Sequence, residues 1–259
     1  MTPSLHVEAL EGGIRAFTLD RPDRKNALDD GLLNALAAAL EAAASEHVRA
    51  LLFRGRGGAF CSGSDLGALP EVEPGGPLPD DRVMEVLGKV PAHPAPSVAL
   101  VEGPAFGAGC DLAMGCDFRI AAPSAVFCLP PARLGIVYSE EGLARVARVI
   151  GLQRARLMFL TGRRIDAQTA LAWGLVDELA TSAEDAEAKA MALCRQLAGN
   201  APLAVRGMRR AFRFLDRAVL TDEERASLRE ARYEAFASSD AREGREAFHE
   251  KRPPVFSGR

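Results

Sequence analysis

The stretch SVALVEGPAFGAGCDLAM, residues 97–114, says most about the fold. Residues 97–101 form a continuous apolar run, which is typical of a buried strand. Residues 108–116 are small and predict a closely packed helix. The glycines between these two elements let the backbone approach another segment or a ligand closely. Because open α/β sheets bind ligands at the carboxyl ends of parallel strands, this junction is a candidate ligand site.

A second glycine-rich junction, GGAFCSGSDL at residues 57–66, follows an apolar strand predicted at residues 49–53. No Gly-Lys-Ser/Thr follows either junction, which excludes a phosphate loop. Leu112 stands where a dinucleotide fingerprint would have its third glycine. Ser62 and Ser64 lack the flanking glycines of a nucleophile elbow. Taken singly, each junction could be merely a tight turn.

Further elements on both sides of these junctions predict an α/β protein with a mostly parallel sheet and crossover helices. Residues 5–10 and 14–19 flank Glu11-Gly12-Gly13 and predict a hairpin. An alanine- and leucine-rich helix is expected at 32–44, and a strand at 117–121. Residues 71–79 are rich in glycine and proline and predict a surface excursion. From residue 140 onward helical patterns dominate, at 141–150, 153–160, 166–172, 182–199, 202–218, 222–238 and 240–252, with one extended stretch at 175–179.

The composition excludes several functional classes. The chain has 259 residues, 32 Lys plus Arg against 35 Asp plus Glu, and a net charge of −3, which argues against a nucleic-acid binder. No apolar run has the roughly 20 residues of a membrane helix. The first residues have neither a basic nor an apolar signal region, so we expect a cytoplasmic protein that binds neither nucleic acid nor membrane.

Cysteine and histidine patterns favour neither disulfides nor a metal site. Five cysteines without regular spacing fit a reducing compartment. The four histidines are scattered and none has a neighbouring ligand at metal-binding spacing. His93 lies in the proline-rich segment 91–96, for which we expect a solvated loop. A histidine base is therefore not expected.

The two junctions, in this order, resemble the paired signatures of the crotonase superfamily, the enoyl-CoA hydratase/isomerase family. Matching motifs extend over most of the chain. They are RP at 21–22, KNAL at 25–28, LG at 134–135, TG at 161–162, ALAWGLV at 170–176 and AFHEKR at 247–252. The resemblance implies a ClpP/crotonase-type spiral ββα core in residues 1–200 and a helical C-terminal trimerisation region in residues 201–259.

The resemblance implies that the backbone amides of Ser64 and Ala108 form an oxyanion hole. Two such donors bind an enolate oxygen more strongly than the ground-state carbonyl. It also implies a coenzyme A channel along Lys25, Ala27, Leu28 and Ser62. Coenzyme A is then part of an acyl-CoA thioester substrate, and no separate cofactor or metal is expected.

Two further residues, Phe248 and Lys251, are implied to close this channel, often from a neighbouring subunit of a homotrimer or dimer of trimers. The family often has a basic residue where this chain has Gly67. Arg24 or Lys251 could then compensate the cofactor phosphates, while Arg24 and Lys25 could equally be solvated surface charges.

One departure from the family pattern concerns the reaction. Asp111 occupies the position of the first carboxylate of a family hydratase, but Pro131 replaces the second, and proline cannot transfer a proton. We therefore expect one-carboxylate isomerase or hydratase chemistry with Asp111 as the acid/base. Glu140 and Glu141 could act as substitute bases or could simply complement the positive end of a helix.

Pro131 combined with Tyr138 resembles methylmalonyl-CoA decarboxylase within the same superfamily. This alternative is decarboxylation of a malonyl-type acyl-CoA, with Tyr138 orienting the carboxylate or protonating the enolate. That enzyme has a histidine at the position of Ser64, and Tyr138 could also be a packing residue. A catalytically degenerate acyl-CoA-binding protein remains a third possibility. The sequence favours no particular acyl chain length.

Overall fold

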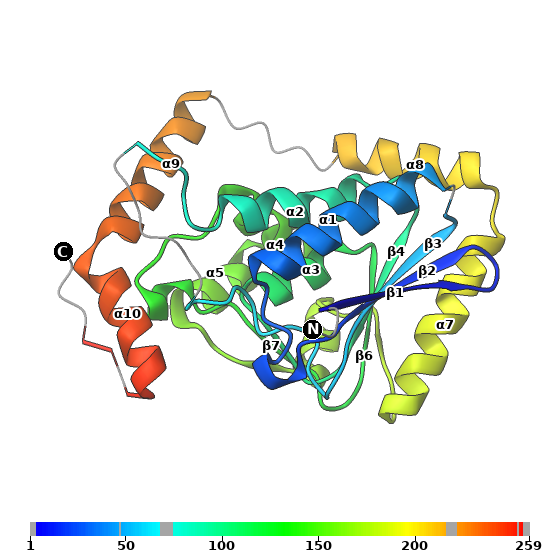
Figure 1. The fold of residues 1–259 in the computed structure, drawn as a ribbon, viewed down its shortest axis with the longest axis horizontal. Helices are drawn as coiled ribbons and strands as arrows, with labels where there is room; N and C mark the ends of the chain where they lie inside the picture. The colour runs from blue at the N-terminus through cyan, green and yellow to red at the C-terminus, as the bar shows by residue number, and fades with distance from the viewer. Residues whose placement is uncertain (1–3, 47, 68–74, 216–221, 253, 256–259) are drawn as a thin grey trace.

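A six-stranded, mostly parallel sheet forms the centre of the molecule in the computed structural model, which describes residues 4–46, 48–67, 75–215, 222–252 and 254–255 (Figure 1). The strand order is β1-β2-β3-β4-β6-β9, and only the β1–β2 hairpin is antiparallel. The strands are β1 (Leu5–Leu10), β2 (Ile14–Leu19), β3 (Ala50–Gly55), β4 (Ser97–Val101), β6 (Phe118–Ala121) and β9 (Glu178–Leu179). The predicted hairpin and parallel α/β sheet are confirmed.

Helices cover both faces of this sheet because each face is apolar. On one face α7 (Ala183–Gly199) packs its small residues against strand side chains such as Leu52 and Val98. The small residues recur every fourth position, as a helix contact face requires. They are Ala186, Ala190, Cys194 and Ala198.

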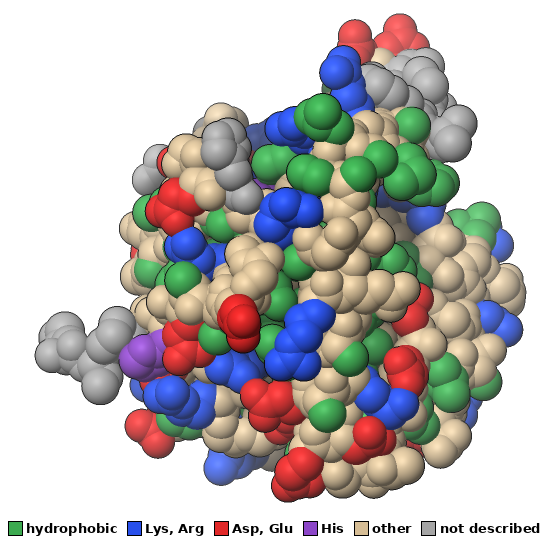
Figure 2. Space-filling view, turned by 90° about the vertical axis from the view of Figure 1, so that its right-hand side faces the viewer, with side chains coloured by type: hydrophobic (Ala, Val, Ile, Leu, Met, Phe, Trp, Pro, Cys, Tyr) green, Lys and Arg blue, Asp and Glu red, His purple; other side chains and the backbone are tan. Residues whose placement is uncertain are grey.

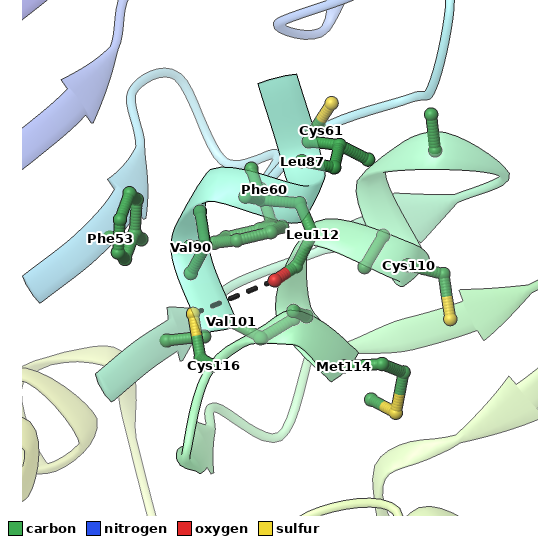
Figure 3. Close-up of a cluster of buried hydrophobic side chains, with 14 of the residues drawn as sticks. Phe53, Phe60, Cys61, Leu87, Val90, Val101, Cys110, Leu112, Met114 and Cys116 are labelled. Atoms are coloured by element: carbon green, nitrogen blue, oxygen red, sulfur yellow. Dashed lines mark hydrogen bonds between the residues drawn. The ribbon is translucent and has the colours of Figure 1, made fainter. Parts of the chain in front are cut away.

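On the other face lie α1 (Asp30–Ser45), α2 (Asp81–Ala92) and α3 (Ala108–Gly115). The Asp29 side chain caps α1 by accepting the Leu32 N–H at 2.8 Å. Figure 3 shows the packed side chains beneath α3, including Phe60 and Leu112, where the Cys116 thiol donates to the Leu112 carbonyl at 3.5 Å. The helix that follows the second junction is thus held on a rigid core.

A small second sheet was not expected from the sequence. It consists of β5 (Pro104–Phe106), β7 (Val126–Cys128) and β8 (Ile165–Asp166), in the order β5-β7-β8. Strands of two or three residues are too short to show a hydrophobic period, so the sequence shows only a loop at residues 102–106. The pairing of β5 with β7 holds the second junction in place.

Of the predicted surface excursion at 71–79, residues 75–79 form neither helix nor strand, and residues 71–74 lie outside the described residues. The chain then continues into α2, whose buried Val83, Val86, Leu87 and Val90 follow a helical spacing. The expectation of a solvated loop at 91–96 was wrong for His93. His93 is 5% exposed instead of solvated: its Nδ1 accepts the Ala95 N–H at 3.0 Å, and Arg209 donates to its backbone carbonyl. Burial lowers the pKa of His93.

The C-terminal half is helical, as expected. After the short helix η2 (Pro131–Leu134) come α4 (Glu140–Ile150), α5 (Leu152–Thr161), α6 (Ala167–Trp173), α7, α8 (Pro202–Leu215), α9 (Asp222–Ala237) and α10 (Ser239–Glu250). Figure 2 views the side of the molecule that carries α7 and α8, and hydrophobic side chains are exposed on its upper part. Leu203, Met208 and Phe212 of α8 are each more than half exposed.

Candidate active site

The two glycine-rich junctions lie side by side because their backbones pair as a parallel bridge. The Cys61 N–H donates to the Pro104 carbonyl at 3.0 Å, and the Phe106 N–H donates to the Cys61 carbonyl at 2.9 Å. A Cβ on Gly109 would lie 2.2 Å from the Cys61 carbonyl oxygen. Glycine is therefore required at Gly109 for the two segments to approach.

The amides of Ser64 and Ala108 are available for a ligand. A Cβ on Gly63, which precedes Ser64, would lie 3.4 Å from the Ala108 nitrogen, so the two junction ends are adjacent. The neighbouring Gly63 carbonyl and Asp65 N–H both bond to Leu28. Within the described part of the chain, neither Ser64 N–H nor Ala108 N–H has an acceptor. Ala108 is also the first residue of α3, where the helix dipole adds a positive potential.

The segment before α1 supports the first junction. The fully buried Asn26 side chain accepts the Arg21 N–H at 2.8 Å and donates to the carbonyls of Arg56 and Ala59 at 2.9 and 2.7 Å. Asn26 has a positive φ of 57°, a conformation that asparagine tolerates better than most residues. This side chain therefore connects the KNAL motif to the strand that leads into the junction.

The expected channel residues come together in the same region. The Ser62 N–H donates to the Lys25 carbonyl at 2.9 Å, and its hydroxyl donates to the Arg24 carbonyl at 3.2 Å. Lys25 is exposed, whereas Ala27 and Leu28 are 8% and 2% exposed. The side chains of Ala27 and Leu28 thus pack inside the protein, and the predicted place of their backbone along the channel stays a prediction. The exposed groups beside Ser62 are Arg24 and Lys25.

Asp111 lies in the first turn of α3 and is fully buried. The Arg145 Nε donates to its Oδ1 at 2.7 Å, and the Tyr138 hydroxyl donates to its Oδ2 at 3.4 Å. Burial raises the pKa of the Asp111 carboxyl, while Arg145 and Tyr138 act in the opposite direction. Asp111 and Tyr138, both singled out from the sequence, are therefore neighbours. Asp111 lies three residues after Ala108 in the chain.

Arg145 of α4 was missed at the sequence level. Its side chain is 12% exposed and forms an ion pair with Asp111. The available signal was its position three residues after the buried Gly142, which puts both on one helix face. An arginine inside a helix rich in other charges gives no hint, by itself, that it turns inward.

The Tyr138 ring is closely packed. Its centroid is 5.2 Å from that of Phe159, and a Cβ on Gly142 would lie 2.3 Å from its ring. Burial and the neighbouring Asp111 raise the pKa of Tyr138 well above its usual value. The Tyr138 ring thus contributes to packing, while the Tyr138 hydroxyl lies next to Asp111.

Pro131 occupies the position of the predicted second acid/base residue, where it begins η2 and is buried. Because proline has no carboxylate, none stands at this position. Glu140 and Glu141 both lie in the first turn of α4, with Glu141 exposed and Glu140 partly buried. That position suits charges that complement the helix dipole.

The end of α10 lies near the first junction of the same chain. The His249 ring carbon Cε1 would lie 3.5 Å from a Cβ on Gly67, and Gly244 packs against the backbone of Leu134 in η2. Phe248 is 61% exposed and Lys251 is exposed at the helix end. His249, which lies between them in the chain, therefore places this end of α10 beside the chain's own first junction.

In the described residues, no group of three or more His, Cys, Asp or Glu side chains is arranged to hold a metal ion. No helix in that part of the chain combines the length and apolar character needed to cross a bilayer. The five cysteines are all free and buried.

Comparisons with known proteins agree with this geometry. The family model for enoyl-CoA hydratase/isomerase matches residues 9–259. A probable enoyl-CoA hydratase, echA6, of Mycobacterium tuberculosis is 35% identical over 95% of this chain and 96% of its own. The 2,3-dehydroadipyl-CoA hydratase of Escherichia coli K12 is 36% identical over 94% of each chain.

Among solved structures, methylmalonyl-CoA decarboxylase complexed with 2S-carboxypropyl CoA has a TM-score of 0.91 and 26% identity, with all of both chains covered. The α/β fold expected from the motifs is therefore confirmed. The chain belongs to the enoyl-CoA hydratase/isomerase family and is an acyl-CoA enzyme of the crotonase superfamily.

Proposed function

We propose that the chain stabilises the enolate of an acyl-CoA thioester between the amides of Ser64 and Ala108. The observation that carries this proposal is the meeting of two amides without acceptors at the start of α3. When the α-carbon loses a substituent, negative charge develops on the thioester oxygen. The two N–H groups then bind that oxygen more strongly than in the ground state, and loss of one such donor raises the barrier by roughly 2.7–4 kcal/mol.

Asp111 is the proposed proton carrier. It lies one helical turn from the Ala108 amide, and burial raises the pKa of its carboxyl. A single carboxylate can take a proton from one carbon and return it to another, which is double-bond isomerisation. With a water molecule it can also support hydration, and the Escherichia coli relative is named a 2,3-dehydroadipyl-CoA hydratase.

Decarboxylation of a malonyl-type acyl-CoA is the second candidate. The bond between the α-carbon and the carboxylate would break, carbon dioxide would leave, and the electron pair would form the same enolate before protonation. Pro131, the Tyr138 hydroxyl beside Asp111 and the similarity to methylmalonyl-CoA decarboxylase favour it. Binding without turnover is the third reading, since only one carboxylate occupies the acid/base positions.

Mass spectrometry of reactions with enoyl-, 3-hydroxyacyl- and malonyl-type CoA thioesters tests these readings together. Hydration adds 18 mass units, isomerisation leaves the mass unchanged while moving the double bond, and decarboxylation removes 44. Binding of these thioesters without conversion would support the degenerate reading. If none of them binds, the proposed function is wrong.

We further propose that the chain acts as a homotrimer or a dimer of trimers in the cytoplasm. The exposed hydrophobic side chains of α8 support self-association, because large exposed apolar patches typically mark interfaces. Coenzyme A enters as part of the substrate, and the exposed Arg24, Lys25 and Lys251 are the proposed partners of its phosphates.

A further inference from the structure

The guanidinium of Arg145 has bonding capacity that Asp111 does not use. Its Nε donates to Asp111, whereas its two terminal nitrogens have no acceptor within the described parts of the chain. The side chain is 12% exposed. Neither terminal nitrogen is among the buried polar atoms without a partner in the described residues, so both reach solvent-accessible space and can meet an acceptor on a ligand.

The orientation of Arg145 follows helix α3. Its Nε meets Asp111, and its Nη1 lies 3.8 Å from the place of a Cβ on Gly115, one helical turn further from Ala108. Four residues of helix correspond to about 6 Å along the axis. Nη1 therefore lies on the side of Asp111 that faces away from the proposed oxyanion amides.

We infer that Arg145 recognises a second carboxylate at the far end of the acyl group, so that the preferred substrates are dicarboxylic acyl-CoA thioesters. This inference rests on the proposed function, because it assumes that the acyl chain extends from Ser64 and Ala108 past Asp111. A planar guanidinium with two terminal N–H donors matches a carboxylate in bidentate geometry. Asp111 and the substrate carboxylate would then share one cation.

The shared cation also removes an electrostatic objection. A substrate carboxylate near the buried Asp111 would otherwise place two negative charges together in a poorly solvated region. Arg145, at 2.7 Å from Asp111, supplies the compensating positive charge. A hydrocarbon acyl chain of the same length gains nothing from this arrangement.

Equilibrium binding of adipyl-CoA and hexanoyl-CoA tests the inference, because the two thioesters have equal length and differ in the terminal carboxylate. Wild-type protein should bind adipyl-CoA at least tenfold more tightly. Arg145→Met should weaken adipyl-CoA by at least about 30-fold, with little change for hexanoyl-CoA. Arg148→Met, on the exposed side of the same helix, is the matched control and should change neither affinity.

Asp111→Asn gives a result of opposite sign. Removing the competing carboxylate frees Arg145, so adipyl-CoA should bind at least threefold more tightly while hexanoyl-CoA is unchanged. If Arg145→Met fails to fold, the double variant Arg145→Met with Asp111→Asn removes both charges, and it should retain hexanoyl-CoA and lose the preference for adipyl-CoA.

Equal wild-type affinities for the two thioesters would overturn the inference and leave the proposed function intact. Equal weakening of both by Arg145→Met would assign that residue a structural role only, which also overturns it. If neither thioester binds the wild-type protein, the proposed function itself fails.

Discussion

Asp111 has both carboxylate oxygens in contact with a charged or polar partner, which limits how it can act. Arg145 takes one oxygen and Tyr138 the other, so a proton must be exchanged within this network. Asp111→Asn should lower turnover by at least about a hundredfold, in line with the usual contribution of a general acid/base, while acyl-CoA binding persists. Steady-state kinetics with parallel binding measurements checks this. Unchanged turnover would exclude Asp111 as the proton carrier.

Pro131 offers a gain-of-function test at the same scale. Because it is buried at the start of η2, a glutamate there would add the missing second carboxylate. Pro131→Glu should raise hydration of crotonyl-CoA above that of the parent, measured by loss of enoyl absorbance. Pro131→Gln has the same shape without the charge and should not. No gain in a folded Glu variant would mean that the pocket differs from that of a hydratase by more than one residue.

Sequence patterns predicted some site residues and missed others for a physical reason. Ser64, Ala108 and Asp111 are adjacent to glycine motifs, where the chemistry is local in the chain. Arg145 is recognisable only once α3 and α4 pack together, because its partner comes from another helix. The side chains of Ala27 and Leu28 are buried, and the predicted role of their backbone along the coenzyme A channel stays a prediction.

At the scale of elements, the contact between the two junctions depends on missing side chains. Gly109→Ala would place a methyl carbon 2.2 Å from the Cys61 carbonyl oxygen. We expect a loss of about 1–3 kcal/mol or more in the free energy of unfolding, together with loss of turnover. Gly88→Ala in α2 is the matched control, because nothing lies within 4 Å of its Cβ position.

The control should instead stabilise the protein by roughly 0.5–1 kcal/mol, since alanine favours a helix over glycine. Urea denaturation of both variants measures the two changes. A similar effect of both substitutions would contradict the proposed close approach of the junctions.

The buried His93 links α2 to the sheet and makes this region sensitive to acid. Burial lowers the pKa of His93 in the folded state below its ordinary value of 6.5, so the unfolded chain binds a proton that the native protein excludes. The contribution of the neutral His93 side chain to the free energy of unfolding is therefore fully present above pH 6.5 and is lost as the pH falls below it. The slope from this group is at most about 1.4 kcal/mol per pH unit.

Urea unfolding at pH 7.5 and 5.5 measures that slope, and His93→Gln should reduce it. His249→Gln is the control, because His249 is exposed. Equal slopes in wild type and His93→Gln would remove His93 as the source. The sequence suggested a solvated loop here because prolines often mark one. Only the packing of the segment against α1 and α8 buries the ring.

At the scale of the whole molecule, the exposed apolar side chains of α8 belong to the proposed subunit interface. Met208→Asp combined with Phe212→Asp should shift the protein toward monomers, measured by analytical ultracentrifugation. Charges at an apolar interface disfavour association. Val7→Asp, at another exposed hydrophobic position, should leave the assembly unchanged. Identical sedimentation of the wild type, the double variant and Val7→Asp would mean that α8 takes no part in assembly.

The overall architecture was predictable to the extent that it depends on long periodic segments. The parallel sheet, α1, α7 and the C-terminal helices follow from apolar runs and helix spacing. The division into residues 1–200 and 201–259 stays a prediction. The small sheet β5-β7-β8 was not predictable, because its short strands are defined by pairing with distant segments.

The bridge between Cys61 and Ala105 makes the active site a product of folding. Its two amides come from segments separated by α2 and β4 in the chain, and the native pairing of β3 with β4 brings these segments together. A partly folded chain in which the two junctions are apart therefore lacks the proposed site. Ligand binding reports on the native state as a whole, and it favours that state over every unfolded form by mass action.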